Sequence, residues 1–550
     1  IRMPAPPTGI VLGPAGKKLY VTCAAPISTV VVLDVASGKE IASIPTGHTA
    51  MGPAISPDGK TLYVCNRFDN EVAVIDLVKH QETARVATSR EPVAAAITPD
   101  GATLFVANLL PPGRADTFDT SAVVTAIDTA SNEATSIRLP NGSTAVRGLC
   151  VSPDGKTVFA VHVMGRYHLP ATHVAGGWLN TSAMRVIDVA EKRLVDAVLL
   201  DDVELGAANP WGITFTADGK SICISHAGTH ELSVIDAKGL MKRLLGEADG
   251  RMKTAKPVQD DLAFLVGLRR RVNLQGGDPL EPFDPTLVNG PRGLTVVGAK
   301  VFAAAYFSDS LAVVDLAPKY GTGVSRIALG PKPQLSVQRR GEMIFNDATL
   351  CLQNWQSCAS CHTDARVDGL NRDLLNDGAG TPKNVRSLLL AHSTAPAMST
   401  GNIPNAEGEV RKGLAHILFS LRPEEDAVAI DAYLKSVQPV PSPYLVDGKL
   451  SPAAEHGKRL FSAQANCVKC HAEPLYTDGE LHDVGSRARY DQRADFDTPT
   501  LIEVWRTAPY RHDGQYVTVK EHLVEGKHSE HVEALSEQQV DDLVEFVLSL

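Results

Sequence analysis

The pentapeptide Cys-x-x-Cys-His occurs twice in this chain of 550 residues. Two thiols three positions apart can form thioether bonds with both vinyl groups of one porphyrin, and the adjoining histidine can then bind its iron. The sequence therefore predicts two covalently bound haem c groups. The residues are Cys358, Cys361 and His362 in the first copy, and Cys467, Cys470 and His471 in the second.

A zinc site is the competing explanation for such paired cysteines. Structural zinc takes four protein ligands, and neither copy has a second Cys-x-x-Cys pair nearby. Two complete haem motifs in one chain are also a rare chance event. The predicted chemistry is therefore electron transfer or redox catalysis.

The first 330 or so residues repeat a simple pattern of a turn, a β-run and a second run that ends in Asp. One unit reads SPDGKTLYVCN at residues 56–66, followed by EVAVIDL at residues 71–77. Pro-Asp-Gly favours a tight turn, and the alternating Val, Ile, Leu and Tyr residues favour strands. The turns recur first at about 42 residues, as four-stranded propeller blades do.

Six such units can be counted, and a divergent seventh could lie near residues 240–290. The repeat predicts an all-β propeller of six or seven blades over residues 1–334, with a flat β-sandwich as the alternative architecture. The phrases LYVCN and SPDGKTLYV resemble the YVTN family of β-propellers. A locally basic insertion at residues 262–278 contains Arg269, Arg270 and Arg271. We expect it to be a solvated loop, with a cover over the haem cleft or a contact with an anionic partner as the alternatives.

From about residue 335 the sequence changes to helical periodicity and proline-rich loops. The segments EEDAVAIDAYLKSV (424–437) and EQQVDDLVEFVLSL (537–550) repeat apolar residues at helical spacing. RGEMIF precedes the first haem motif and GKRLF precedes the second, which indicates a duplicated unit. We expect two mainly α cytochrome c-like domains, at 335–440 and 441–550, joined near the prolines of residues 438–445.

This half resembles the superfamily of bacterial di-haem cytochrome c peroxidases and MauG. The matching stretches are RRGEMIF with SCASCH, GTPKNVRSLLL, GKRLF with CVKCH, and TPTLIEVWRTAPYRHDGQYVTVKEHL. A propeller beside such a module also resembles the arrangement in hydrazine synthase. The resemblance implies that one haem reacts with a small molecule at an open iron position while the other relays electrons.

For the first haem, the resemblance implies a vacant or water-bound position opposite His362. The distal histidine of many family peroxidases would fall at residues 377–380, which read DGAG and offer no such base. The resemblance implies a Gln and a Glu that move a proton between the peroxide oxygens; Glu409 aligns loosely with that Gln position, and a solvated helix position is its alternative interpretation. His392 and Met398 are alternative iron ligands. The Trp that the family places between its haems is missing from its usual loop, and Trp355 or Trp505 could replace it.

For the second haem, the resemblance implies a sixth ligand on the segment after the APYRHDG loop. No Met or Tyr occurs in LVEGKHSEHVEALSE, so His528 is the predicted partner of His471, with His512 as the alternative. A pair of imidazoles would give this haem a lower potential than a His/Met pair would. The family also holds a calcium ion between its haem domains with backbone carbonyls, and residues 498–500 match that segment.

Histidines also gather in the predicted loops of two neighbouring propeller units. We expect these loops on one face, where imidazoles could bind copper or zinc, line a substrate or docking surface, or simply be scattered loop residues. The residues are His162, His168, His173, His226 and His230.

The composition is that of an ordinary globular protein, with no apolar run near the length of a membrane span. Its formal net charge of −10 argues against nucleic acid as a partner. Haem c attachment follows export, so we expect a periplasmic protein whose signal peptide is absent from this sequence. Five cysteines remain outside the haem motifs, and we expect them to be small buried residues rather than disulfides.

The sequence therefore predicts a periplasmic di-haem c-type oxidoreductase of the peroxidase/MauG type. A small oxidant such as peroxide would react at the first haem, and electrons would arrive through the second from a small redox protein or small-molecule donor. The alternatives are an electron-transfer cytochrome whose propeller docks a partner, and a hydrazine-synthase-like enzyme acting on a small nitrogen compound.

Overall fold

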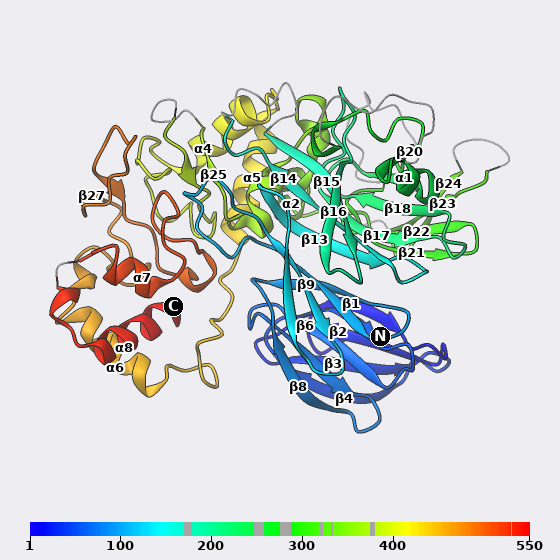
Figure 1. Ribbon diagram of the computed structural model, residues 1–550. Helices are drawn as coiled ribbons and strands as arrows, with labels where there is room; N and C mark the ends of the chain where they lie inside the picture. Colours follow the sequence, from blue (N-terminus) through cyan, green and yellow to red (C-terminus); the bar gives the residue numbers. More distant parts are fainter. Residues whose placement is uncertain are drawn as a thin grey trace.

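Six four-stranded antiparallel sheets follow one another along the first 328 residues and form the blades of a propeller (Figure 1). The computed structural model describes residues 1–169, 179–246, 258–275, 288–318, 323–331, 334–374, 380–529 and 531–550. In each blade the strands pair with their neighbours in chain order, so every blade is a meander. The predicted all-β propeller is confirmed.

The strands of the first three blades are β1 (Pro7–Leu12), β2 (Lys18–Cys23), β3 (Ser28–Asp34), β4 (Glu40–Thr46), β5 (Ala50–Ile55), β6 (Thr61–Asn66), β7 (Glu71–Asp76), β8 (Gln81–Ala87), β9 (Pro92–Ile97), β10 (Thr103–Asn108), β11 (Val123–Asp128) and β12 (Ala134–Arg138). Those of the last three are β13 (Ser143–Val151), β14 (Thr157–Gly165), β15 (Asn180–Asp188), β16 (Arg193–Leu199), β17 (Pro210–Phe215), β18 (Ser221–His226), β19 (Glu231–Asp236), β20 (Arg269–Asn273), β21 (Pro291–Val297), β22 (Lys300–Ala305), β23 (Ser310–Asp315) and β24 (Val324–Ala328).

The Pro-Asp-Gly turns join the first and second strands of a blade, and side-chain hydrogen bonds fix them. Between β5 and β6, Asp58 accepts hydrogen bonds from the Ser56 hydroxyl (2.6 Å) and the Lys60 amide (3.0 Å). Gly59 has φ +71°, a conformation that side chains disfavour. This is why the repeat requires a small hydroxyl residue, Asp and Gly in that order.

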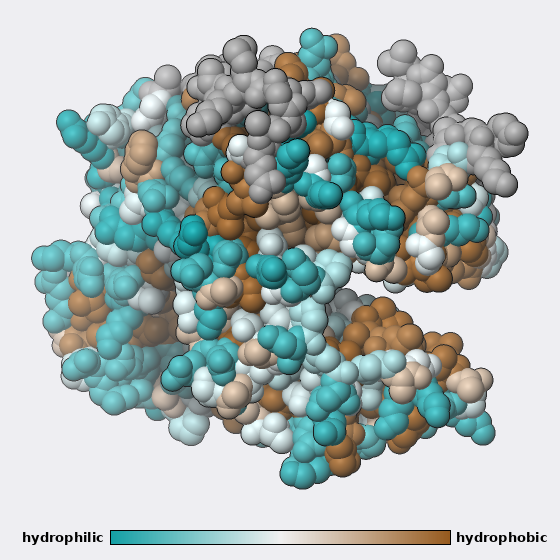
Figure 2. Space-filling model, turned by 45° about the vertical axis from the view of Figure 1, so that its right-hand side comes forward, coloured by the Kyte–Doolittle hydropathy of each residue, from teal (hydrophilic) through white to brown (hydrophobic). Residues whose placement is uncertain are grey.

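The innermost strands pack side by side from β1 to β21, but no comparable packing joins β21 back to β1 among the described strands. Figure 2 shows a notch with hydrophobic walls on this side of the molecule. Ile10 and Leu12 of β1 are 64% and 50% exposed, and Val297 of β21 is 65% exposed. The described ring is therefore open, and each of its two end blades packs against a neighbouring blade on one side only.

A seventh blade was considered for the region near residues 240–290. In the structure this region contains the outer strand of the fifth blade. Helix α1 (Ala237–Leu244) leads out of β19, and β20 then completes the sheet. The expectation of a solvated basic loop is wrong for Arg269 and Arg271. They lie on β20, and both form ion pairs with Asp202.

The C-terminal region contains the helices, and we call residues 335–440 the first lobe and 441–550 the second lobe. The first lobe has α2 (Val337–Asn346), α3 (Cys358–Cys361), α4 (Ala406–Lys412), a π-helical turn (Gly413–Ile417) and α5 (Glu424–Ser436). The second has α6 (Pro452–Ser462), α7 (Val519–Val524) and α8 (Glu537–Leu548). Short hairpins pair β25 (Asn371–Arg372) with β26 (Lys383–Asn384), and β27 (Leu481–His482) with β28 (Phe496–Asp497).

Each lobe is organised around one tightly crossed helix pair, and a glycine sits at each crossing. A side chain at Gly341 of α2 would meet the carbonyl of Ala429 on α5, and one at Gly457 of α6 would meet the carbonyl of Asp542 on α8. These are the glycines of the two matching segments RGEMIF and GKRLF. The structural correspondence supports the predicted internal duplication.

The proline-rich segment of residues 438–445 runs from the first lobe to the second, between α5 and α6 in Figure 1. None of the helices in the described ranges is long and apolar enough to span a membrane. The five cysteines outside the haem motifs are unbonded: Cys23, Cys65, Cys223 and Cys351 are buried, and Cys150 is half-buried.

Candidate functional site

The first haem motif forms one helical turn whose hydrogen bonds orient its histidine. In α3, Ser357 and Ser360 cap the turn reciprocally, and the amide of His362 donates to the Cys358 carbonyl (2.9 Å). His362 Nδ1 lies 3.0 Å from the Arg386 carbonyl oxygen. Because a carbonyl only accepts, Nδ1 carries the proton and Nε2 is left for an iron atom.

The second motif repeats this arrangement. The amide of His471 donates to the Cys467 carbonyl (2.9 Å), and its Nδ1 donates to the Tyr476 carbonyl (3.0 Å). The thiols of both motifs are free of disulfide bonds. Burial lowers the pKa of His471 and of His362, which keeps both imidazoles neutral. The chemistry of both donor sets fits covalent haem c.

A second imidazole faces His471. The ring centres of His471 and His528 are 6.2 Å apart. Two metal–nitrogen bonds of about 2.0 Å, with about 1.1 Å from each nitrogen to its ring centre, span roughly the same length. His528 Nδ1 is buried without a hydrogen-bond partner. Burial and the neighbouring His471 lower the pKa of His528 to about 4. The predicted pair His471 and His528 thus lie at the separation that one shared iron would require.

Two other histidines of the second lobe, His522 and His512, bear on this assignment. The ring of His522 on α7 is 4.5 Å from that of His528, and its Nδ1 is also buried without a partner. Sequence reasoning missed His522, although its position six residues before His528 was visible. His512, the alternative ligand, donates from Nε2 to Asp491 (2.7 Å) and stacks on Phe496 with ring centres 3.8 Å apart. That nitrogen is therefore already engaged.

The first lobe differs in its described residues. In the described part of the chain, no imidazole packs against His362 as His528 does against His471. His392 is tied to Asp431 by a 3.0 Å contact from Nε2. Met398 has φ +70°, and its carbonyl accepts a hydrogen bond from Arg386 (3.0 Å). Of residues 377–380, only Gly380 belongs to the described part of the chain.

Glu409 has the properties of a proton-transfer group. It lies on α4, whose neighbouring Val410 packs in the same apolar cluster as Cys358 of the first haem motif. Its Oε2 is buried and has no hydrogen-bond partner. Burial raises the pKa of Glu409 to about 7, against the opposing effect of Lys412. A carboxyl with this pKa can both accept and donate a proton near neutral pH.

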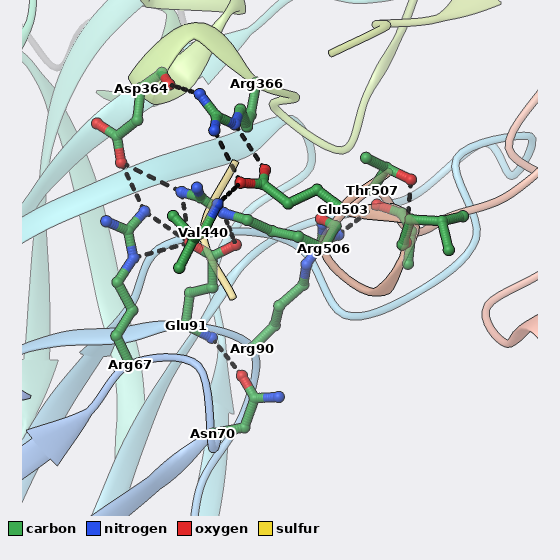
Figure 3. Close-up of polar contacts among 12 residues, drawn as sticks. Arg67, Asn70, Arg90, Glu91, Asp364, Arg366, Val440, Glu503, Arg506 and Thr507 are labelled. Atoms are coloured by element: carbon green, nitrogen blue, oxygen red, sulfur yellow. Dashed lines mark hydrogen bonds and ion pairs between the residues drawn. The ribbon is translucent and has the colours of Figure 1, made fainter. Parts of the chain in front are cut away.

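A buried network of arginines and carboxylates locks the propeller and the two lobes together, as Figure 3 shows. Asp364, two residues after His362, contacts Arg67 (2.6 Å) and Arg147 (2.8 Å) of the propeller and Arg506 (3.5 Å) of the second lobe. Although burial alone would raise it, these arginines hold the pKa of Asp364 well below its usual range. Glu91 of the propeller also pairs with Arg67 and Arg506.

The two lobes share a second ion pair at the edge of this network. Arg366, which follows the first haem motif, contacts Glu503 of the second lobe at 2.7 and 2.8 Å through a bidentate pair. Glu503 also accepts from the amide of Val440 in the connecting segment (2.6 Å). Such fork-to-fork pairs fix orientation as well as distance. The haem motifs are therefore held in a defined relative position.

A route of alternating hydrogen bonds and covalent links connects the histidines of the two motifs. Arg386, whose carbonyl accepts from His362, donates from its guanidinium to Asp497 (2.7 Å). The adjacent Thr498 carbonyl accepts from the Thr477 hydroxyl (2.6 Å), and Thr477 follows Tyr476, the partner of His471. The lobes thus share a short bonded route between their iron ligands.

The two tryptophans considered for electron transfer lie elsewhere. Trp355 is buried in the apolar core of the first lobe. Trp505 packs on the propeller, with its ring centre 5.1 Å from that of Phe68 and 6.5 Å from that of His48. Neither is part of the bonded route through Arg386.

The segment implied to bind calcium offers one suitable ligand atom. Asp497 Oδ1 is buried without a hydrogen-bond partner, next to residues 498–500. A hard cation prefers such carboxylate and carbonyl oxygens. The Thr498 carbonyl already accepts from Thr477, so the donor set fits calcium in part.

Of the predicted propeller histidines, the four that the structure describes form no shared metal site. His162 donates from Nδ1 to the Val163 carbonyl (2.7 Å) and accepts at Nε2 from Arg185 (2.7 Å). His226 is likewise bonded at both ring nitrogens. The third buried histidine, His230, contacts Asp347 of the first lobe, with 3.2 Å between His230 Nε2 and Asp347 Oδ1. His168 is exposed and contacts the Phe118 carbonyl, and His173 lies outside the described residues.

Comparison with known proteins agrees with this architecture. The family model "Cytochrome c" matches residues 454–550. The hydrazine synthase subunit gamma of Kuenenia stuttgartiensis is 25% identical over 271 residues, covering 38% of this chain and 77% of that protein. The subunit beta of the same enzyme is 31% identical over 193 residues, covering 34% of this chain and 45% of that protein.

A third relative is the methylamine utilization protein MauG of Methylorubrum extorquens. It is 24% identical over 246 residues, covering 34% of this chain and 68% of that protein. These similarities and the geometry of the attachment turns lead to one conclusion. The chain is a haem c oxidoreductase in which a six-bladed β-propeller is fused to a cytochrome module similar to MauG and to hydrazine synthase subunits.

Proposed function

We propose that this protein is a periplasmic di-haem oxidoreductase in which the two lobes have different roles. The first haem, bound by Cys358, Cys361 and His362, is open to a small oxidant such as peroxide. The second, bound by Cys467 and Cys470, is closed by His471 and His528 and relays electrons. The observation that carries the proposal is the asymmetry between the lobes: among the described residues, His471 has a neighbouring imidazole, with ring centres 6.2 Å apart, and His362 has none.

The residues of the first lobe would position and deprotonate the oxidant. The haem group supplies the redox-active iron when it is bound. Glu409, with a pKa near 7, would accept a proton from the incoming peroxide and return it to the leaving oxygen. Arg386 holds His362 through its carbonyl, so the iron ligand and the route to the second lobe are fixed by one residue.

The electron donor is proposed to be a small redox protein or a small molecule. The bonded route through Asp497 and Thr498 supports relay from the second haem to the first. Periplasmic location is supported by the covalent haem chemistry and by the similarity to MauG. Calcium near Asp497 would stiffen the contact between the lobes, because a hard cation there would bind oxygens of the inter-lobe segment.

Reaction of the resting protein with peroxide and of the reduced protein with carbon monoxide tests the proposal. We expect one carbon monoxide molecule per chain, and turnover of peroxide with an artificial donor. A protein that binds no carbon monoxide and consumes no peroxide would be an electron-transfer cytochrome instead.

A second candidate function is chemistry on a small nitrogen compound. It is favoured by the similarity to two subunits of one enzyme, hydrazine synthase, at 25% and 31% identity. Steady-state assays with hydroxylamine in place of peroxide distinguish the two candidates, since the favoured substrate should give the larger kcat/KM.

A further inference from the structure

A pocket lies between the propeller and the first lobe, behind the first haem-attachment turn. It is lined by Arg147, Trp211 and Arg292 of the propeller and by Ala359 and Asn346 of the first lobe. Ala359 and Ser360 are the residues between the two thiols, and Ser360 donates to Asn209, another lining residue (2.7 Å). The side of the turn away from the thiols therefore faces this pocket.

Three consecutive blades supply the charged and aromatic wall from equivalent positions. Arg147, Trp211 and Arg292 lie at the register shifts of the innermost strands β13, β17 and β21. Such bulges redirect side chains and are common beside functional sites. In the first two of these strands the glycine after the bulged residue allows close packing, since a side chain at Gly148 would meet the Trp211 carbonyl and one at Gly212 would meet the Arg292 carbonyl.

The two arginines stack on the same indole. The guanidinium carbons of Arg147 and Arg292 are each 4.2 Å from the Trp211 ring centre, and that of Arg292 is also 3.6 Å from the Tyr306 ring centre. Stacking uses the flat faces of a guanidinium and leaves its N–H edge free to bind an anion.

Among the described residues, Arg292 differs from the arginines near it because no carboxylate contacts it. Arg147 pairs with Asp364 (2.8 Å), and Arg339, which also stacks on Tyr306, pairs with Glu342 (2.6 Å). Arg292 Nε is buried without a hydrogen-bond partner. Burial, together with Arg147, lowers the pKa of Arg292 to about 10, against the opposing effects of Tyr306, Asp364 and Glu342. An uncompensated buried cation is costly unless a counter-ion joins it.

The remaining walls limit the size and charge of that counter-ion. Both side-chain ends of Asn209 are already bonded to Ser357 and Ser360, and the Asn346 amide donates to the Glu342 carbonyl. The pocket thus offers one unpaired cation among walls that are apolar, aromatic or already bonded. This selects a small monoanion over a dianion.

We propose that Arg292, with Trp211 and Arg147, binds a small monoanion with a planar two-oxygen edge, such as a carboxylate or an inorganic oxyanion. The guanidinium fork matches this edge with two parallel hydrogen bonds. The anion would sit beside the first haem and lower its reduction potential by its charge.

Calorimetric titration of the haem-loaded chain with acetate and with nitrate, in chloride-free buffer, tests this site. Cyanide is kept in excess so that the first haem iron is blocked, which makes the result independent of the proposed reaction at that iron. We expect one saturable site per chain for at least one anion. Saturation by acetate alone identifies a carboxylate ligand, and saturation by nitrate alone identifies an inorganic oxyanion.

The variant Arg292→Gln should weaken this binding at least tenfold, and Arg292→Lys, which keeps the charge but loses the fork, should weaken it less. Arg138→Gln is the matched control, because Arg138 is an exposed propeller arginine paired with Asp119; it should bind as the parent does. Circular dichroism and haem absorbance verify that each variant is folded. No saturable binding in the parent protein, or equal affinity in the parent and Arg292→Lys and Arg292→Gln, would overturn the proposal.

Discussion

The first and second lobes share their attachment chemistry but differ in what faces the iron ligand. Both use a helix pair crossed at a glycine, a Cys-x-x-Cys-His turn and a histidine whose Nδ1 donates to a backbone carbonyl. In the second lobe the ring centres of His528 and His471 are 6.2 Å apart. In the first lobe the group we single out is the Glu409 carboxyl, whose pKa is raised by burial. The two lobes thus share the attachment motif and differ on the side opposite its histidine, which is the basis for assigning them different proposed roles.

The largest predicted effects come from removing one attachment site at a time. The double variants Cys358→Ser/Cys361→Ser and Cys467→Ser/Cys470→Ser should each lower the haem content from two to one per chain, measured by pyridine haemochrome. Carbon monoxide binding should disappear only in the first. Equal loss of carbon monoxide binding in both would contradict the division of roles.

Opening the closed site should abolish the asymmetry. In His528→Ala the second haem loses its sixth ligand, so its ferric form should change from low spin to high spin, and carbon monoxide binding should rise to two per chain. His512→Ala is the control, because His512 is engaged with Asp491 and Phe496. The prediction fails if His512→Ala gives the spin change and His528→Ala does not.

Removing the proton-transfer group should affect the first lobe alone. Glu409→Gln should slow the reaction with peroxide by about 10²- to 10³-fold, a usual range for loss of an acid–base group. The parent rate should rise with pH through about 7, because the ionised carboxylate accepts the proton, and this limb should vanish in the variant. Stopped-flow absorbance at several pH values measures both effects.

Glu407→Gln is the matched control for that experiment. Glu407 lies on the same helix and pairs with Lys435 across the surface. In Glu407→Gln the rate of reaction with peroxide and its pH profile should remain those of the parent protein. A pH limb that survives in Glu409→Gln would assign the titration to another group.

The smallest effect concerns the network that fixes the first lobe on the propeller. Asp364→Asn leaves Arg67 and Arg147 without their shared carboxylate. It should lower the free energy of unfolding by about 2–3 kcal/mol. This is less than the loss expected for a fully buried pair, because the Asp364 side chain is 31% exposed. Urea unfolding followed by haem absorbance measures it. Asp119→Asn, at an exposed ion pair, should have a much smaller effect.

The pH dependence of this effect has a defined sign. The folded-state pKa of Asp364 is depressed, so its contribution is present above the unfolded value of about 3.9 and is lost as pH falls below it. The difference between parent and Asp364→Asn should therefore shrink between neutral pH and pH 3. A difference that stays constant over this range would mean that Asp364 is not held ionised by the arginines.

What could be predicted from the sequence was mostly local. Short stretches of about ten residues were enough to predict the Pro-Asp-Gly turns, the alternating strands and the turns of the two Cys-x-x-Cys-His motifs. All of them are present in the structure. His528 could be proposed from the residue types of one short segment. Arg292 could not be proposed from the sequence. Its role depends on the rings of Trp211 and Tyr306, which are distant in sequence, and on nearby carboxylates that pair with other arginines.

Other features also required the folded structure. Glu409 was visible as a carboxylate, but its raised pKa results from burial that no local pattern indicates. Arg269 and Arg271 read as a solvated basic loop, yet they form an outer strand with Asp202 as a shared partner. The sequence predicted that the propeller histidines lie in loops on one face. In the structure His162 and His226 are buried, and each is held by hydrogen bonds to its own partners.

Electron paramagnetic resonance of the resting, fully oxidised protein tests the difference between the lobes most directly. The account predicts two ferric signals of equal weight, one high spin from the haem bound to His362 and one low spin from the haem bound between His471 and His528. Two low-spin signals that persist after partial reduction would contradict it, because both iron atoms would then be closed on both sides.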